Sequence, residues 1–144
     1  MILDDEYFMR QALAEAEKAM AADEVPIGAL IVADGKILAR AHNMVERLND
    51  VTAHAEMMAF TAAAEAIGGK YLKGCTLYVT LEPCLMCSGA SYWTQIDRIV
   101  VGAKDEKRGF LSQGVKLHPQ TEYTQGVLAE ECSNIIVSYF KSKR

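Results

Sequence analysis

Apolar positions in the first part of the chain repeat at helical spacing. Residues 4–22 place Met9, Leu13 and Ala16 on one face, in a segment rich in Ala, Glu and Lys. That spacing is typical of an amphipathic helix. Pro26 cannot continue a helix, so the pattern predicts a helix over about 4–22.

The next apolar positions are typical of a β-hairpin. Two aliphatic runs within residues 27–42 flank the pair Asp34-Gly35, and a polar segment, "NMVERLND", follows. An Asp-Gly pair between two such runs is a strong hairpin signal. The sequence therefore predicts two paired strands and then a loop.

"TAHAEMMAFTAAAEA", residues 52–66, is predicted to form a helix. Asp50 and Thr52 precede it as candidate capping residues, and Gly68-Gly69 is expected to end it. His54 and Glu56 stand in the first turn of this otherwise apolar helix.

The second half of the chain alternates strands and helices. "CTLYVTL" (75–81) predicts a strand buried on both faces, "CLMCSGASYW" (84–93) a helix after Pro83, and "DRIVVGA" (97–103) another strand. Residues 104–126 are predicted to form a long loop. The last helix is predicted from about Val127, with an apolar stripe made of Leu128, Cys132, Ile135, Ile136 and Tyr139.

This order of elements, α-β-β-α-β-α-β-loop-α, predicts a mixed sheet with helices on both faces. In such sheets, sites form where strands end beside helix N-termini. His54 and Cys84 both lie at junctions of that kind.

Composition limits the class of protein. A chain of 144 residues, 51% hydrophobic and 24% charged, is expected to form one globular domain over 1–144. No apolar run approaches the ~20 residues of a membrane helix. The N-terminal segment lacks the basic and apolar regions of a signal peptide, so the expected location is the cytoplasm.

Net charge is −4, which disfavours a nucleic-acid partner, but the charges are unevenly distributed. Residues 1–24 carry seven acidic and two basic side chains, whereas Lys107 and Arg108 stand in a basic loop and the chain ends in a basic tail. Such segments are either solvated surface or a patch for phosphates. Charge alone leaves both interpretations open.

Cys84 and Cys87 form a C-x-x-C pair at a predicted helix start. In a reducing compartment such a pair indicates redox, catalytic or metal chemistry, or arises by chance. Cys75 and Cys132 stand in apolar surroundings and are predicted to be buried.

His54 adds a third ligand to the pair. One His and two Cys suit zinc and leave a fourth position for water or hydroxide, which is the pattern of a catalytic site with one zinc ion per subunit. Glu56 is then a candidate proton carrier, although a glutamate in a first turn is also favoured by the helix dipole alone. H-A-E followed by P-C-x-x-C is the known signature of zinc nucleobase deaminases.

Longer segments carry a wider resemblance. "EVPIGALIV", "VTAHAEMMA", "TLYVTLEPCLMCSGA", "RIVVGAKDEKRG" and "EECSNIIVSYFKSKR" resemble, in that order, the cytidine deaminase-like superfamily and most closely its bacterial tRNA-specific adenosine deaminases. The resemblance implies a three-layer α/β/α sandwich with a mixed five-stranded sheet, a homodimer, and tRNA as partner.

The resemblance also implies roles for individual residues. Zinc would be bound by His54, Cys84 and Cys87, with Glu56 as the catalytic residue. Substrate would be contacted by Asn43, Ala55, Pro83, Asp105 and Lys107. RNA would be contacted by Arg108, Lys141, Lys143 and Arg144. Val51 and the segments 91–95 and 110–113 depart from the family pattern and concern substrate selection, while His42 and His118 are expected to be structural.

Three hypotheses follow. The first is hydrolytic deamination of adenosine to inosine in the tRNA anticodon loop, where an unpaired base leaves its stack most easily. The second is a small-molecule deaminase of the same fold acting on guanine, cytosine or a free nucleoside, which the acidic net charge favours. The third is a zinc-stabilised or RNA-binding subunit without activity. Glu56 disfavours it, because a subunit without activity has no need of a carboxylate beside the metal.

Overall fold

The protein, described by a computed structural model over residues 3–144, contains one five-stranded sheet and five helices among those residues. The elements follow in the order α1 (Asp5–Ala21), β1 (Gly28–Ala33), β2 (Lys36–His42), α2 (Val45–Leu48), α3 (Ala55–Ile67), β3 (Cys75–Leu81), α4 (Leu85–Thr94), β4 (Arg98–Ala103), β5 (Glu122–Gln125) and α5 (Ala129–Ser142).

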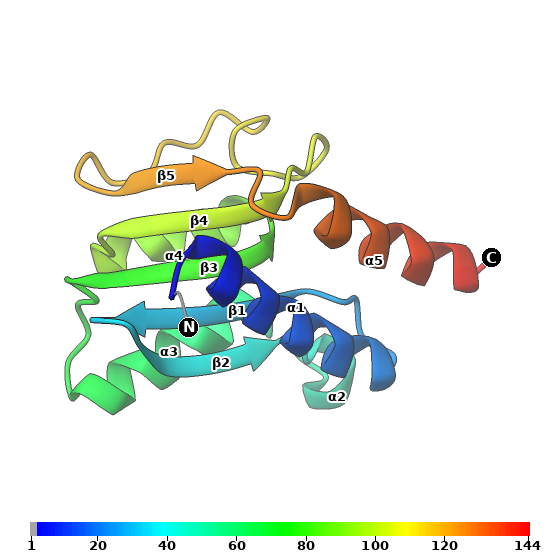
Figure 1. Cartoon of the computed structure of the whole chain (residues 1–144), viewed down its shortest axis with the longest axis horizontal. Helices are drawn as coiled ribbons and strands as arrows, with labels where there is room; N and C mark the ends of the chain where they lie inside the picture. The colour runs from blue at the N-terminus through cyan, green and yellow to red at the C-terminus, as the bar shows by residue number, and fades with distance from the viewer. Residues whose placement is uncertain (1–2) are drawn as a thin grey trace.

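The strand directions bring several strand ends to one edge of the sheet. The strand order is β2-β1-β3-β4-β5. β1 pairs antiparallel with both β2 and β3, while β3, β4 and β5 are mutually parallel. β2 therefore points the same way as β3 and β4, and the carboxyl ends of these strands share an edge (Figure 1).

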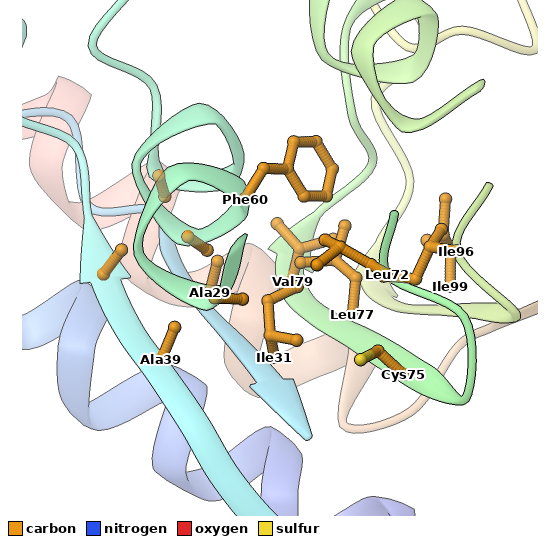
Figure 2. Close-up of a cluster of buried hydrophobic side chains, with 14 of the residues drawn as sticks. Ala29, Ile31, Ala39, Phe60, Leu72, Cys75, Leu77, Val79, Ile96 and Ile99 are labelled. Atoms are coloured by element: carbon orange, nitrogen blue, oxygen red, sulfur yellow. The ribbon is translucent and has the colours of Figure 1, made fainter. Parts of the chain in front are cut away.

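Helices cover both faces of the sheet, as Figure 1 shows: α1 and α5 lie on one face, α3 and α4 on the other. One apolar cluster lies on each face. Alternate residues of a strand point to opposite faces, so in β1 Ile31 packs towards α3 and Leu30 towards α1. Figure 2 shows the layer under α3, where Phe60 lies over Val79 and Leu77. The three-layer α/β/α fold with a mixed five-stranded sheet is confirmed.

Local signals in the sequence were accurate. Asp34 and Gly35 both have positive φ, 50° and 73°, which is the two-residue turn that favours Asp-Gly between paired strands. Gly68 ends α3 in the left-handed conformation, at φ 71°. Cys75 and Cys132 are buried, as predicted.

Three sequence predictions were wrong in part. The predicted loop 104–126 contains β5, whose four mostly polar residues pair only with β4 at the sheet edge and so carry no apolar strand pattern. The polar segment after β2 contains the short helix α2. α5 begins at Ala129, not Val127, and of its predicted stripe only Cys132 and Tyr139 are buried.

The capping prediction for α3 was also wrong. Its N-cap is His54, with no capping bond from that side chain. The Asp50 carboxylate instead accepts hydrogen bonds from the amide and hydroxyl of Thr52, at 2.8 and 2.7 Å, and closes a turn before the helix. Across residues 3–144, every helix is too short or too polar to traverse a bilayer.

Candidate metal centre and active site

The predicted metal ligands stand at the starts of two helices. His54 is the N-cap of α3 and Cys84 the N-cap of α4, and neither side chain bonds to its own helix. An N-cap side chain ordinarily accepts a hydrogen bond from the first turn. Here both side chains are free to turn towards one another, and Cys87, in the first turn of α4, joins them.

The distances among these side chains fit one zinc ion. Nδ1 of His54 lies 3.7 Å from Sγ of Cys84 and 3.6 Å from Sγ of Cys87. All three ligand atoms lie within 4.8 Å of one another. Ordinary Zn–N and Zn–S bond lengths at tetrahedral angles place such an N···S pair about 3.6 Å apart. The donor set and its spacing therefore suit zinc with one position left open.

Asn43 fixes the start of α3 from a distant loop. Its Oδ1 accepts a hydrogen bond from the amide of Ala55 at 2.8 Å, and its side chain is buried. This bond satisfies an amide at the N-terminus of the helix, which the helix itself cannot do. Asn43 follows the carboxyl end of β2, so it ties that strand end to the metal centre.

Glu56 lies beside the ligands and is only 4% exposed. Burial disfavours its charged form and raises its pKa to about 7, with the negative Cys84 adding to the effect and His54 and the Cys87 thiol opposing it. A carboxyl group with this pKa can both hold and release a proton near neutrality. The alternative of a solvent-facing glutamate is therefore wrong.

The two cysteines share charge unequally. A hydrogen bond from the Cys87 thiol, and then one from His54, lowers the pKa of Cys84 to about 3 despite partial burial. The same contact with the Cys84 thiolate, together with burial, raises the pKa of Cys87. The hydrogen bond to Cys84 raises the pKa of His54. Metal binding displaces such protons, because the ligands of zinc are the thiolate and the neutral imidazole.

Glu82 is a buried residue that sequence analysis did not single out. It is 3% exposed, and its carboxylate accepts hydrogen bonds from the amides of Asp105 and Leu111, both at 3.0 Å. It thereby fastens the loop after β4 to the end of β3. The available signal was a charged residue directly after an apolar strand and two residues before Cys84.

Glu24 plays a similar part on the other side of the site. It is 2% exposed, and its carboxylate accepts hydrogen bonds from the amides of Glu46 and Arg47, at 3.0 and 2.8 Å. These amides begin α2, in the segment that runs from Asn43 to His54. A buried carboxylate thus fixes this segment as well.

The other residues predicted to contact substrate or RNA in this region lie in or next to the loop that Glu82 holds. The carbonyl of Pro83 accepts a hydrogen bond from the amide of Phe110 at 2.9 Å. Oδ1 of Asp105 accepts the amides of Lys107 and Arg108, at 3.1 and 3.0 Å, and both basic side chains are exposed. Their contacts with substrate stay predictions.

The basic tail and the other two histidines make contacts within the protein. Lys143 is ion-paired with Asp23, while Lys141 and Arg144 are exposed. Nδ1 of His42 lies 3.1 Å from a Glu15 carboxylate oxygen, and Nδ1 of His118 accepts the amide of Gln120 at 3.1 Å. These two contacts are consistent with the structural roles expected for both histidines.

A site with three such ligands, one open position and a buried carboxyl group suits hydrolysis by an activated water. Comparison with known proteins agrees. The model of the cytidine and deoxycytidylate deaminase zinc-binding region matches residues 3–103. The chain belongs to this family, and it is a hydrolytic deaminase with zinc as its cofactor.

The chain is also similar to individual deaminases whose substrates are named. The chain is 44% identical to the tRNA-specific adenosine deaminase of Bacillus subtilis, over 97% of this chain and 91% of that protein. A solved structure from work on A-to-I editing by tRNA:A34 deaminases at the wobble position superposes with a TM-score of 0.83 at 44% identity, covering 90% of this chain and 98% of that one. The guanine deaminase of Bacillus subtilis superposes with a TM-score of 0.67 at 39% identity, over 70% and 65% of the two chains.

Proposed function

We propose that this protein deaminates adenosine to inosine at the wobble position of a tRNA anticodon loop. The observation that carries the chemistry is the buried Glu56 carboxyl group beside His54, Cys84 and Cys87. The RNA substrate is supported by the near full-length similarity to tRNA-specific adenosine deaminases. An anticodon loop suits the reaction because its bases are unpaired and can be turned outwards.

In the proposed mechanism, His54, Cys84 and Cys87 hold the zinc ion. Zinc, when bound, would act as a Lewis acid that lowers the pKa of its bound water from the bulk value towards ~7. Glu56 accepts the proton of the attacking water and delivers it to the ring nitrogen next to C6. The water oxygen forms a bond to C6, and Glu56 then takes the remaining proton of that oxygen and passes it to the amino group. The C6–N bond breaks, the amine leaves as ammonia with the bonding electrons, and the C6–O group becomes the carbonyl of inosine.

The substrate-binding residues would hold the nucleoside around that centre. Asn43 would contact the nucleoside, and Ala55 and Pro83 would contact the base through their backbones. The amide of Ala55 itself already donates a hydrogen bond to Oδ1 of Asn43. Asp105 and Lys107 would lie next to the flipped nucleoside, with Arg108 and the tail residues Lys141, Lys143 and Arg144 along the RNA.

We also propose that the protein is a cytoplasmic homodimer in which the neighbouring subunit completes each active site. Support comes from α4, the helix that begins at Cys84: its apolar side chains Leu85, Tyr92 and Trp93 are 57%, 42% and 77% exposed in the single chain. Light scattering tests the homodimer: the wild type should have the mass of a dimer and Trp93→Glu that of a monomer. A monomeric wild type would contradict the proposal.

An ammonia-release assay tests the function. The expected result is turnover of an anticodon stem-loop with adenosine at the wobble position, and none of the matched stem-loop with guanosine there. Free guanine, cytosine and adenosine are the competing substrates, because the similarity to a guanine deaminase and the net charge of −4 favour the small-molecule alternative. Faster turnover of a free base than of the stem-loop would establish that alternative.

Salt provides a second measurement in the same assay. If Lys107, Arg108 and the tail contact phosphates, binding of the stem-loop should weaken steeply as salt rises, because counterions compete for the RNA. Turnover of a small neutral substrate should hardly change. A stem-loop KM that is independent of salt would contradict the proposed RNA contacts.

A further inference from the structure

The loop after β4 is held by one buried carboxylate, Glu82. Within the part of the chain that the structure describes, the Glu82 carboxylate accepts hydrogen bonds from the amides of Asp105 and Leu111. Both partners are donors and each bonds a different oxygen, so the two ends of the Glu82 side chain must both be acceptors, as in a carboxylate. The loop between these two anchor points, residues 105–111, is called the clamped loop below.

The clamped loop runs directly along the cysteine segment. Gly109 forms a bridge with Cys84 in antiparallel orientation, and the amide of Phe110 donates to the carbonyl of Pro83 at 2.9 Å. A Cβ atom on Gly109 would overlap the carboxylate of Glu82 and the carbonyl oxygen of Asp105. The clamped loop therefore approaches Glu82 more closely than any residue with a side chain would allow.

The same loop presents its charged side chains from a turn. Oδ1 of Asp105 accepts the amides of Lys107 and Arg108, so the turn is closed by the residue whose own amide Glu82 holds. Lys107 and Arg108 are exposed. In Figure 1 the loop leaves β4 at the edge where β3 also ends. The position of Glu82 thus sets where these two cations stand relative to Cys84.

We propose that Glu82 is a positioning residue for substrate RNA: it holds the clamped loop in register with the metal centre, so that Lys107 and Arg108 meet the strand that flanks the target base. The proposal rests on the proposed RNA function. Glu82 does not touch the reacting atoms, so its removal affects how RNA is bound and not how the amino group is hydrolysed.

The test is Glu82→Gln in the full-length zinc-loaded protein. Gln keeps the shape but offers one acceptor oxygen, and its NH₂ group faces a backbone donor. The expected result is a KM for the anticodon stem-loop raised about tenfold, the effect of one lost hydrogen bond to a charged group, with kcat changed less than about twofold. Zinc content should stay at the wild-type level, and the amides of Asp105 and Leu111 should exchange with solvent faster.

Two further variants separate positioning from general stability. Glu15→Gln removes another buried carboxylate, paired with Lys18 and His42 on the other face of the sheet, and should lower the melting temperature without changing KM. Gly109→Ala leaves Glu82 intact but displaces the clamped loop, and should reproduce the raised KM. It decides the question if Glu82→Gln does not fold.

The contrary results are distinct. An unchanged KM in Glu82→Gln, or in Gly109→Ala where only that variant folds, would overturn the role of Glu82. So would a fall in kcat with KM unchanged, because Glu82 would then act on the chemistry. A wild-type protein that does not turn over the stem-loop overturns the proposed function, and the proposal with it, and this failure is visible before any variant is measured.

Discussion

The metal ligands of this protein and the two loops that we propose to face the substrate are held in place by different kinds of interaction. His54 is the N-cap of α3, whose apolar face packs on the sheet, and Cys84 is the N-cap of α4, which packs against α3. The clamped loop and the segment after Asn43 contain little regular structure, and buried carboxylates hold them through backbone amides. The ligands depend on packed helices, whereas the loops depend on a few hydrogen bonds.

The helix starts and the loops should therefore differ in how well they tolerate substitutions. A helix start is fixed by many contacts along the helix, so a single substitution outside the ligands moves it little. A loop held by one carboxylate loses its position when that carboxylate is lost. If the loops contact the substrate as proposed, chemistry and substrate selection depend on different parts of the site, and variants of the ligands, of Glu56 and of a distant ion pair should differ accordingly.

The largest effect is expected from Cys87→Ser. This substitution removes one of three protein ligands, so zinc affinity should fall by more than the roughly 10–100-fold that loss of an outer contact produces. Activity should disappear, and the melting temperature should fall and no longer respond to a chelator, because zinc binding stabilises the folded state. Metal analysis and thermal unfolding measure both.

The matched control for that variant is Cys75→Ser, a buried cysteine outside the cluster. It should lose some stability and keep its zinc. Full zinc occupancy in Cys87→Ser would contradict the assignment of the ligands.

The next largest effect is expected from Glu56→Gln. The amide cannot carry protons, so kcat should fall by a factor of about 10²–10⁴. Zinc content and the KM for the stem-loop should stay near the wild-type values, since Glu56 is not assigned as a ligand or an RNA contact. Single-turnover kinetics and metal analysis on the same sample check this.

Glu65→Gln, on the exposed side of the same helix, is the control for Glu56→Gln and should behave as the wild type. Near-normal turnover by Glu56→Gln would remove that residue from the mechanism. Loss of zinc in that variant would instead show that the substitution displaces His54, and that helix packing does not hold the start of α3 rigidly.

The smallest effect is expected from Asp5→Asn, at the end of the strands that lies away from the metal centre. Arg98, at the start of β4, donates two hydrogen bonds to Asp5, at 2.8 and 2.7 Å, and this contact lowers the pKa of Asp5 below its usual 3.8 despite partial burial. Asp5→Asn should therefore lower the free energy of unfolding by about 1 kcal/mol at neutral pH. Activity should be unchanged, because neither the ligands nor the loops are touched.

The sign of the pH dependence follows from the lowered pKa. The stabilisation by ionised Asp5 is complete above its unfolded-state pKa of 3.8 and is lost as pH falls through the lower folded-state value. The unfolding curves of wild type and Asp5→Asn should therefore converge below about pH 4, with Glu6→Gln as the exposed control. A constant difference down to pH 2 would contradict the assigned ion pair.

The parts of the fold that the sequence predicted are those encoded by neighbouring residues. α1, the hairpin turn at Asp34-Gly35 and the end of α3 at Gly68 each depend on spacing or on a residue with special backbone freedom. β5 has four mostly polar residues at an edge, so its pairing depends on β4 and not on its own pattern.

The candidate site divides in the same way. His54, Glu56, Cys84 and Cys87 could be predicted because they occur as two compact motifs. Glu82 could not, because its bonding partners lie 23 and 29 residues further along the chain. The cap of α3 was misassigned for the same reason: the acceptor is Asn43, twelve residues before the amide that it accepts, and not a residue in the preceding turn.

The bond between Asn43 and Ala55 has a consequence for recognition. With Oδ1 engaged at 2.8 Å, the amide plane of Asn43 has one orientation, and the bond fixes where its two Nδ2 hydrogens point. If Asn43 contacts substrate as proposed, these hydrogens would face a hydrogen-bond acceptor on the ligand. The entropy of fixing this side chain is lost during folding, and ligand binding does not incur that loss a second time.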